Sequence, residues 1–515
     1  MSITEAGTGA HNLGFSEHFS LGFPRIHRLA AGLLLLGVFA LQSVLSLSLH
    51  NTAHQDEALY LSGGHLVLDQ FRGGPTVTGT YATYFSGLPG FYPPLGGTLD
   101  AWGGLEAARL FSLACMLAVT GAVFLIGRCL FGQAAGLLAA LVFAGQGTVL
   151  FLGHFATFDA LSLMLLALGT VLAFRTALSP LPAGAYGVGA TLGLAVGAKY
   201  AALLYVPVVF AILALQASEH RGMRAARGRV GAAVGAFLVT GTLLLAVSGT
   251  DVFQGMADTT TRRVVLMPLP RISLAERTIT WECLLFSLAS VGLAVGGARL
   301  GPLLLILLGA ALLAPAYQIY AGEATSLHKH IAFGLFFAAP PAGAALARMG
   351  GAGKRAAGRR LFVAAVCALV WGLGWHQAKA LFDDWPNGTA LTGMLRGLVR
   401  SGDVMLAEEP HVPQYYLRNI VAPDHWHDLY WFQYTDRAGD RLMGREAYRA
   451  AIAAGYFDVV VLFYGRHSGT RPQEVDAGLK TGRGYALVGH VPFQSGSEAG
   501  TYWVWHRRPE LTPKL

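Results

Sequence analysis

The sequence predicts a mainly α-helical polytopic membrane protein: a bundle of transmembrane helices followed by a small α/β domain. Of its 515 residues, 54% are hydrophobic and only 13% are charged, a composition typical of membrane proteins. Apolar stretches recur as far as residue 381, and beyond that point the chain changes to short strand-like and helix-like segments. We therefore expect a membrane domain over residues 1–382 and a soluble domain over residues 383–515.

Each apolar stretch is close to the length of about 20 residues that a helix needs to cross a bilayer. About eleven stretches meet this length rule, and they lie at residues 28–49, 107–127, 133–152, 155–174, 183–198, 200–217, 230–249, 281–298, 301–320, 329–347 and 361–381. The first is too long for a signal peptide and lacks a good cleavage site, so we interpret it as a span. Residues 1–24 are expected to form a disordered cytoplasmic tail.

The distribution of basic residues predicts the topology. Lys and Arg cluster around residues 25–28, 221–229 and 354–360, and the predicted spans place these three regions on one side of the membrane. Because cytoplasmic loops carry an excess of Lys and Arg, we expect a plasma-membrane protein with a cytoplasmic N-terminus and an extracytoplasmic C-terminal domain. The net charge of +8 mostly reflects this bias, and no basic-aromatic stripe suggests nucleic-acid binding.

The C-terminal domain is predicted from alternating segments. Residues 388–400 and 444–454 have helical patterns, and the strand-like segments are residues 403–407, 458–463, 485–491 and 501–505. The run VVVLF at 459–463 is typical of a strand buried on both faces. The cysteines, Cys115, Cys129, Cys283 and Cys367, all fall in or beside spans, so we expect neither a disulfide in the domain nor a metal-ligand motif.

Asp56 and Glu57 are the most informative residues, because they follow the first span at the start of a long extracytoplasmic loop. Residues 56–68 have the pattern of a helix on the membrane surface, and residues 87–97 (GLPGFYPPLGG) that of a turn-rich segment. Adjacent helical positions point about 100° apart, so the two acids cannot act as a facing dyad. Both are candidate catalytic residues; alternatively, they only complement the helix dipole.

Asp159 and Lys199 lie at the same predicted membrane boundary as Asp56. Asp159 is at the extracytoplasmic end of the fourth span, and an ionisable group in an apolar segment normally faces protein or water rather than lipid. It is a candidate catalytic acid or a helix-start residue. Lys199 lies between the fifth and sixth spans, where it either extends to the headgroups or binds the anionic part of a substrate.

Basic residues in two other segments are candidate ligands for an anion. His328, Lys329 and His330 open the tenth span, although a helix N-terminus favours anions over cations. This conflict suggests that the cluster binds an anion such as phosphate. Arg262 and Arg263, in the loop after the seventh span, are candidate phosphate ligands or solvated surface charges.

Several short segments resemble the GT-C glycosyltransferases, in particular bacterial relatives of protein mannosyltransferases and lipid A aminoarabinose transferases. The resemblance covers most of the membrane domain and depends on the order of the segments. They are Asp56-Glu57, residues 92–95 (YPPL), 107–112 (AARLFS), 128–132 (RCLFG), 156–161 (ATFDAL) and 197–199 (GAK). Tyr92 stands where relatives often have His, and HKH at 328–330 replaces a more usual Arg-Tyr-like start.

The resemblance implies a GT-C-like bundle and transfer of a hexosyl or pentosyl group from a polyprenyl-phosphate donor. Asp56 would be the general base of an inverting displacement, and Asp159 would orient the acceptor or Asp56. Lys199 and residues 328–330 would contact the donor phosphate, with Tyr92 as a further substrate-binding candidate. The implied partners are the lipid-linked donor, membrane lipid, and a protein, glycan or lipid acceptor.

The reaction requires no cofactor, because the leaving phosphate already carries charge, although oxygen ligands at Asp56 and Asp159 are compatible with a divalent metal. The main alternative is a transporter or lipid flippase. Transporters usually carry polar sites near the bilayer midplane and internal repeats, and neither pattern is evident here. A second alternative is a glycan-binding receptor that uses aromatic residues of the tail, namely Tyr415, Trp426, Tyr430 and Trp431.

Overall fold

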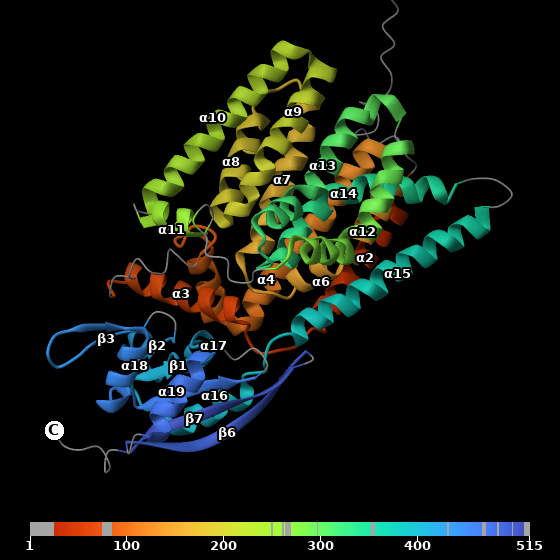
Figure 1. The fold of residues 1–515 in the computed structure, drawn as a ribbon. Helices are drawn as coiled ribbons and strands as arrows, with labels where there is room; N and C mark the ends of the chain where they lie inside the picture. The colour runs from red at the N-terminus through yellow and green to blue at the C-terminus, as the bar shows by residue number, and fades with distance from the viewer. Residues whose placement is uncertain are drawn as a thin grey trace, which may run out of the picture.

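The computed structural model describes residues 25–74, 85–248, 251–259, 262, 269–295, 297–351, 356–429, 432–465, 470–481, 484–496 and 498–508. The helices up to residue 383 form a polytopic bundle, and a small α/β region lies against one end of it (Figure 1). The helices of the bundle are α2 (Arg25–Leu47), α3 (Gln55–Phe71), α4 (Tyr92–Phe131), α5 (Gln133–Ala144), α6 (Gly147–Leu152), α7 (Phe158–Leu178), α8 (Gly184–Ala198), the 3₁₀ turn η2 (Tyr200–Tyr205), α9 (Val206–Arg221), α10 (Met223–Ser248), α11 (Asp251–Thr259), α12 (Arg271–Val295), α13 (Gly297–Ala321), α14 (Leu327–Met349) and α15 (Ala356–Asp383).

Eight helical segments in the described part of the chain are long and apolar enough to cross a membrane. They are Leu29–Leu47, Tyr92–Phe131, Phe158–Leu178, Tyr200–Arg221, Met223–Ser248, Leu300–Ala321, Leu327–Met349 and Ala356–Asp383. The other three predicted spans coincide with shorter apolar helices at Gln133–Ala144, Gly184–Ala198 and Leu284–Ala294. The total of eleven spans therefore remains a prediction, and the predicted span 133–152 is interrupted between α5 and α6.

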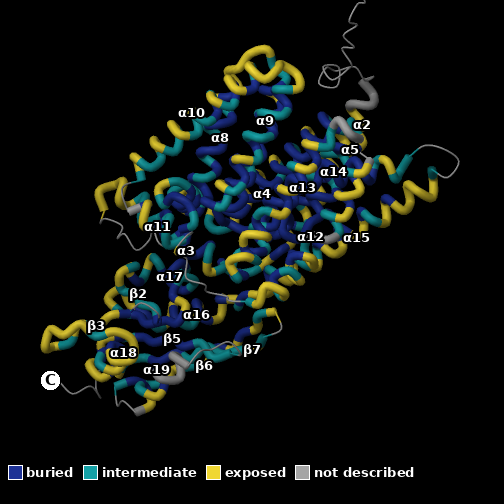
Figure 2. The backbone as a smooth tube through the Cα atoms, turned by 45° about the horizontal axis from the view of Figure 1, so that its top comes forward, coloured by how far each residue is buried: buried dark blue, intermediate teal, exposed yellow. Residues whose placement is uncertain are grey.

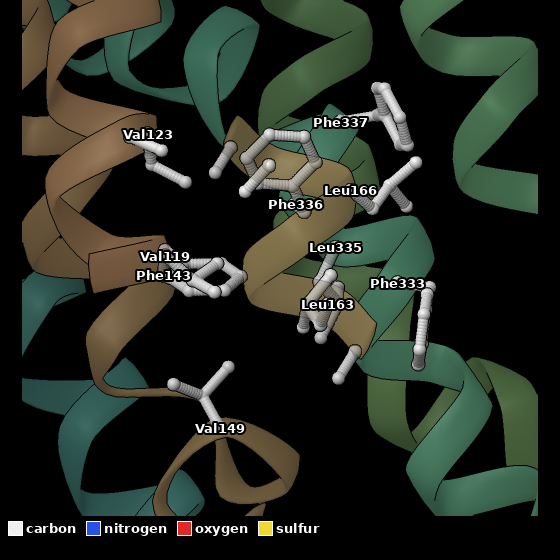
Figure 3. Packing of buried hydrophobic residues seen from close by; sticks show 14 of the residues in the cluster. Val119, Val123, Phe143, Val149, Leu163, Leu166, Phe333, Leu335, Phe336 and Phe337 are labelled. Atoms are coloured by element: carbon white, nitrogen blue, oxygen red, sulfur yellow. The ribbon is translucent and has the colours of Figure 1, made fainter. Parts of the chain in front are cut away.

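Helix α14 forms the centre of the bundle. Nearly every residue of its apolar stretch is buried, whereas most residues of α10 are exposed or only partly buried (Figure 2). Phe333, Phe336 and Phe337 of α14 pack at the junction with α4, α5 and α7, beside Phe143 and Leu166 (Figure 3). The exposed apolar surfaces of α2, α10 and α15 are therefore the faces expected to contact lipid.

Helix α4 corrects part of the prediction of a turn-rich segment over residues 87–97, because only the residues before Tyr92 form bends and turns. The chain is helical from Tyr92 onward, because Pro93 and Pro94 occupy the first turn, where a missing backbone N–H costs nothing. The helix is kinked between Gly103 and Gly104, and Gly104 has a φ of +69°, which side chains with a Cβ rarely adopt. The kink separates a short N-terminal segment from the longer transmembrane part.

Helix α3 lies between the bundle and the C-terminal region (Figure 1). Its bounds, Gln55–Phe71, include the predicted helix at 56–68. It packs closely on the start of α4, since a Cβ placed on Gly64 would come within 2.0 Å of the carbonyl oxygen of Pro93. This contact fixes the surface helix that carries Asp56 and Glu57.

The C-terminal region contains a five-stranded mixed sheet with the strand order β2-β1-β5-β7-β6. β1 is parallel to β2 and β5, and β7 is antiparallel to β5 and β6. A separate antiparallel pair is formed by β3 and β4. The elements are α16 (Thr389–Leu398), β1 (Met405–Ala407), α17 (His411–Leu417), the 3₁₀ turn η3 (Pro423–His425), β2 (Trp426–His427), β3 (Gln433–Thr435), β4 (Arg441–Met443), α18 (Gly444–Ala453), β5 (Val459–Tyr464), α19 (Thr470–Thr481), β6 (Tyr485–Ser495) and β7 (Glu498–Arg507).

Both faces of the central strand β5 are covered, as the apolar run at 459–463 predicts. Val459 and Val461 pack with α16 on one face, and Val460 and Leu462 pack with α18 and α19 on the other. Alternate residues of a strand point to opposite faces, so a continuous apolar run fits this position. Cys115, Cys129 and Cys367 are buried and form no disulfide, and the side chain of Cys283 lies outside the described residues.

Hydrogen bonds attach the C-terminal region to the loop between α2 and α3. The Asn51 side-chain amide donates to the carbonyl oxygens of Phe382 (2.8 Å) and Trp385 (3.1 Å). The indole N–H of Trp385 donates to the Thr52 carbonyl at 3.0 Å. The first loop and the C-terminal region therefore lie at the same end of the bundle.

Candidate active site

The N-terminus of α3 is held by a capping box centred on His54. The Asp56 N–H donates to Nδ1 of His54 at 3.1 Å, and the His54 N–H donates to a Glu57 oxygen at 2.9 Å. Burial lowers the pKa of His54 despite the nearby Asp56 carboxylate. A neutral ring that accepts at Nδ1 carries its proton on Nε2, and the cap fixes both acids relative to the helix axis.

Asp56 forms an ion pair with Lys329 at the start of α14. Lys329 Nζ lies 2.6 Å from Oδ2 of Asp56, and the Lys329 side chain is only 4% exposed, against 30% for Asp56. This is the only hydrogen bond to the Asp56 carboxylate within the described part of the chain. Burial alone would raise the pKa of Asp56, but Lys329, through its charge and its hydrogen bond, and the charge of Lys199 hold it well below its usual range. Asp56 is therefore ionised at neutral pH.

Asp159 and Lys199 form a second ion pair, which is fully enclosed. Lys199 Nζ donates to Oδ1 of Asp159, and the Thr157 hydroxyl donates to Oδ2 at 2.9 Å. The two charged side chains are 2% and 0% exposed, so each depends on the other for compensation. Lys199 takes an extended conformation between α8 and η2, and this break in the helices allows its side chain to turn inward.

The two ion pairs meet at the start of α7. The Lys329 ammonium lies 5.7 Å from the centre of the Phe155 ring, and the Lys199 ammonium lies 5.0 Å from that of Phe158. Asp56, Asp159, Lys199 and Lys329 come from four segments distant in sequence, yet all lie at one end of the bundle. The structure thus brings together two carboxylates and two cations, with a phenylalanine ring beside each ammonium group.

Glu57 points away from this group and is fully buried. Arg109 of α4 contacts both of its oxygens, with Nε 2.9 Å from Oε1 and one terminal nitrogen 2.8 Å from Oε2. The Ala156 N–H donates to Oε1 at 2.8 Å. Burial alone would raise the pKa of Glu57, but Arg109 and these backbone donors lower it. Glu57 therefore connects α3 to α4 and to the segment before α7, and its predicted catalytic role remains a prediction.

His328 and His330, on either side of Lys329 at the start of α14, face different neighbours. His328 packs edge-on against Phe151, with 5.3 Å between the ring centres. His330 Nδ1 lies 3.2 Å from the side-chain oxygen of Gln318 in α13. Successive helical positions point about 100° apart, so Lys329 is the member of the cluster that reaches Asp56. Tyr92 is buried in the core beside Phe158, with 6.1 Å between the ring centres, which places it beneath the site rather than at its surface.

Arg262, the described member of the predicted arginine pair, lies away from this group. Arg262 is exposed after the end of α11, and its backbone N–H donates to the Ala257 carbonyl at 2.7 Å. No contact between Arg262 and the two ion pairs is present among the described residues. Arg263 lies outside the described residues, so its predicted role remains a prediction.

Two arrangements were not predicted from the sequence. Arg109 lies within an apolar span, and that position alone could have indicated a buried partner. Asp100, in the N-terminal segment of α4, accepts a hydrogen bond from the Tyr415 hydroxyl. Its carboxylate also lies 2.6 Å from His65 Nε2 and 3.0 Å from the Arg418 guanidinium. This cluster joins α3, α4 and α17, and no sequence spacing indicates it. Tyr415 and the buried Trp426 therefore have structural contacts, while Tyr430 and Trp431 lie outside the described residues.

A divalent metal has no ready ligand set in the described part of the chain, where no group of three or more His, Cys, Asp or Glu residues is suitably placed. Asp56 and Asp159 are each paired with a lysine. An ion bound to either carboxylate would have to displace that lysine, and metal dependence remains a prediction.

Comparison with protein families gives one match. The family model for dolichyl-phosphate-mannose-protein mannosyltransferases matches residues 102–244, a segment from α4 to α10. No curated protein matches the sequence. The matched segment contains Asp159 and Lys199 and ends before α14.

Solved structures are similar over almost the whole chain. ArnT from Cupriavidus metallidurans in the apo state has a TM-score of 0.60 at 14% identity, covering 92% of this chain and 98% of ArnT. ArnT bound to undecaprenyl phosphate has a TM-score of 0.59 at 14% identity, with 91% and 97% covered. AglB from Archaeoglobus fulgidus, in complex with an inhibitory peptide and a dolichol-phosphate, has a TM-score of 0.50 at 13% identity, with 88% and 72% covered. The shared architecture and the matched segment show that this chain has the GT-C glycosyltransferase fold.

Proposed function

We propose that the protein is a membrane glycosyltransferase that transfers a sugar from a polyprenyl-phosphate donor to an acceptor hydroxyl on the extracytoplasmic face. The observation that carries the proposal is the meeting of the Asp56–Lys329 and Asp159–Lys199 pairs at one end of a GT-C bundle. The structures of ArnT with undecaprenyl phosphate and of AglB with dolichol-phosphate support a lipid phosphate as the donor carrier.

The proposed reaction is a single displacement with inversion. Asp56 accepts the proton of the acceptor hydroxyl as its oxygen attacks the anomeric carbon of the donor. The bond between that carbon and the phosphate oxygen breaks, and polyprenyl phosphate leaves with the bonding electrons. Lys329 and Lys199 stabilise the negative charge of the leaving phosphate, which needs no proton to depart.

The Asp56–Lys329 contact couples donor binding to the strength of the base. A carboxylate with a strongly lowered pKa is a weak proton acceptor, and Lys329 is the main cationic cause of the lowering. When the donor phosphate attracts Lys329, the stabilisation of ionised Asp56 decreases and its pKa rises. Asp56 would therefore become a better base once the donor is bound, which limits proton transfer in the absence of substrate.

The transporter alternative is less well supported. The charged pairs lie at helix ends on one side of the bundle, whereas transporters usually bind substrates near the midplane. Flux of labelled lipid across vesicles without any chemical change to the lipid would favour that alternative.

The decisive experiment uses the full-length protein in lipid nanodiscs with a panel of undecaprenyl-phosphate-linked hexoses and pentoses, and measures released undecaprenyl phosphate. General-base catalysis contributes roughly 10²–10⁴-fold, so Asp56→Asn should lose that factor while retaining donor binding. Asp69→Asn, an exposed acid on the same helix, is the matched control and should keep the parental rate. Transfer by Asp56→Asn at the parental rate would refute the assignment of the base.

A further inference from the structure

A cavity of about 290 Å³ lies between the start of α3 and the C-terminal sheet. From the membrane domain and the linker after α15 it is lined by His54, Gln55, Asp384 and Trp385. From the C-terminal region it is lined by Glu408, Phe463, Phe493, Glu498 and Tyr502, among others. His54 thus has the cavity on one side and the Asp56 backbone, through its capping bond, on the other. A molecule in this cavity would be next to the proposed base but outside the two ion pairs.

The cavity is placed where an open α/β sheet normally binds ligands. Glu408 directly follows β1, and Phe463 is near the end of β5, which is parallel to β1. The beginning of the antiparallel β7 reaches the same edge, since Tyr502 pairs with Phe463. The crevice beyond the carboxyl ends of parallel strands is the usual ligand position in such sheets.

Glu408 is the most unusual residue in the cavity wall. It is 8% exposed, and its Oε2 accepts a hydrogen bond from the Phe463 N–H at 3.0 Å. In the described part of the chain it has no ion pair, and Oε1 accepts no hydrogen bond. A buried carboxylate without a counter-charge is costly unless a cation or hydrogen-bond donor approaches it. Burial raises the pKa of Glu408 to about 7, and the adjacent Glu409 acts in the same direction.

The other residues that line the cavity also favour a positively charged ligand. Within the described part of the chain, the titratable groups that line the cavity with Glu408 are His54, Asp384, Glu409, Glu498 and Tyr502, and no lysine or arginine is among the lining residues. Burial keeps His54 neutral, as its lowered pKa indicates. Trp385, Phe463, Phe493 and Tyr502 add aromatic surface. Carboxylates with aromatic rings suit an ammonium group, and this surface would repel a phosphate.

We propose that this interdomain cavity binds the acceptor and selects one that carries an ammonium group, with Glu408 as the residue that recognises the charge. The proposal rests on the proposed glycosyltransferase function, because it assigns the cavity to the acceptor of that reaction. The C-terminal sheet would then act in substrate selection, while the ion pairs of the membrane domain would bind the donor. His54 would separate the two sites, and the acceptor hydroxyl would extend past it to Asp56.

The test compares three probes that differ only at one carbon: methyl 6-amino-6-deoxyglucoside, methyl glucoside, and methyl glucoside 6-phosphate. Binding to the full-length protein in nanodiscs is measured by saturation-transfer NMR and by tryptophan fluorescence. We expect the ammonium probe to bind about ten-fold more tightly than the hydroxyl probe, the ratio expected for one charge-assisted hydrogen bond, and the phosphate probe not to bind. The preference should increase from pH 6 to pH 8, as Glu408 ionises.

Glu408→Gln keeps the size of the side chain and an acceptor for the Phe463 N–H but removes the charge. It should reduce the preference for the ammonium probe to less than about two-fold, because the charge-assisted bond is lost. Glu446→Gln, an exposed acid in α18 of the same region, is the control and should keep the full preference. If Glu408→Gln does not fold, Glu409→Gln replaces it and should lower the preference in part.

Several results would overturn the proposal. They are equal binding of the ammonium and hydroxyl probes, tighter binding of the phosphate probe, and an undiminished preference in Glu408→Gln. Failure of the proposed function is distinguishable, since it would appear as absent donor cleavage by a protein that still prefers the ammonium probe. The reverse result, donor cleavage without that preference, would refute only the acceptor assignment.

Discussion

The ion pair between Glu57 and Arg109 offers a sharp test of how the site is supported. Four hydrogen bonds reach the Glu57 carboxylate, two from Arg109 and two from backbone N–H groups, and both charged side chains are at most 1% exposed. Removing one partner of a buried pair typically costs about 3–5 kcal/mol, because an uncompensated charge remains buried. Arg109→Met and Glu57→Leu should each destabilise the protein by about that amount.

The variant with both substitutions distinguishes the cost of an unpaired buried charge from the cost of lost packing. When both charges are replaced by apolar groups, no unpaired charge remains, and such replacements are often close to neutral. The Glu57→Leu/Arg109→Met protein should therefore be more stable than either single variant, although its backbone donors at His54 and Ala156 lose their acceptor. This would be a strongly non-additive result.

The measurement is the apparent melting temperature of the protein in detergent, followed by tryptophan fluorescence, together with the rate of sugar transfer. The double variant should recover stability more than activity, because α3 would lose the contacts that fix Asp56 beside Lys329. Additive destabilisation in the double variant, or single variants as stable as the parent, would refute the argument. Glu106→Gln, which removes the charge of a largely exposed partner of Arg109, is the control and should change stability by less than about 1 kcal/mol.

Two further predictions concern charge. Lys329→Met removes the main cationic cause of the low pKa of Asp56, so burial should then raise that pKa. The acid limb of the pH profile of kcat/KM should shift to higher pH. Lys379→Met, at the surface of α15, is the control and should leave the profile unchanged. Glu408 has a folded-state pKa of about 7 against an ordinary value of 4.5, so the stability associated with its protonated form is present below about pH 4.5 and is lost as the pH rises through 7. At 1.36 kcal/mol per pKa unit the difference is roughly 3 kcal/mol, and Glu408→Gln should therefore melt at a higher temperature than the parent at pH 8 but not at pH 4.5. Equal melting temperatures at pH 8 would contradict this reasoning.

The membrane bundle could be predicted because lipid imposes a simple rule on sequence. A helix that crosses the membrane must be apolar over a known length, so each predicted span overlaps one or more helices in the structure. The interruption between α5 and α6 and the helical start of α4 were not predicted. Pro93 and Pro94 are typical of turns as well as of first helical turns, and their sequence does not distinguish the two.

The position of Asp56, Asp159, Lys199 and Lys329 at one end of the bundle could also be inferred, since each lies at the end of an apolar stretch. Which cation pairs with which acid could not, because that depends on helix rotation and packing. Successive helical residues are rotated by about 100°, so the side chains of Asp56 and Glu57 could be predicted to point in different directions. The structure agrees, because Asp56 pairs with Lys329 and Glu57 pairs with Arg109. The Asp100 cluster and the interdomain cavity arise only from tertiary contacts between the bundle and the C-terminal region.

The arrangement of charge at the site has a consequence for the order of binding. In the free protein each buried lysine is matched by one carboxylate, so the site is nearly neutral despite its four charges. An anionic donor can bind only if it competes with Asp56 or Asp159 for a lysine, and the Asp56–Lys329 pair is the more accessible of the two. If Asp56 is the base, as proposed, donor binding should precede its activation, and the acceptor would find a competent base only after the donor is in place. In the proposed reaction this arrangement would avoid premature use of the base and would favour ordered binding with the donor first.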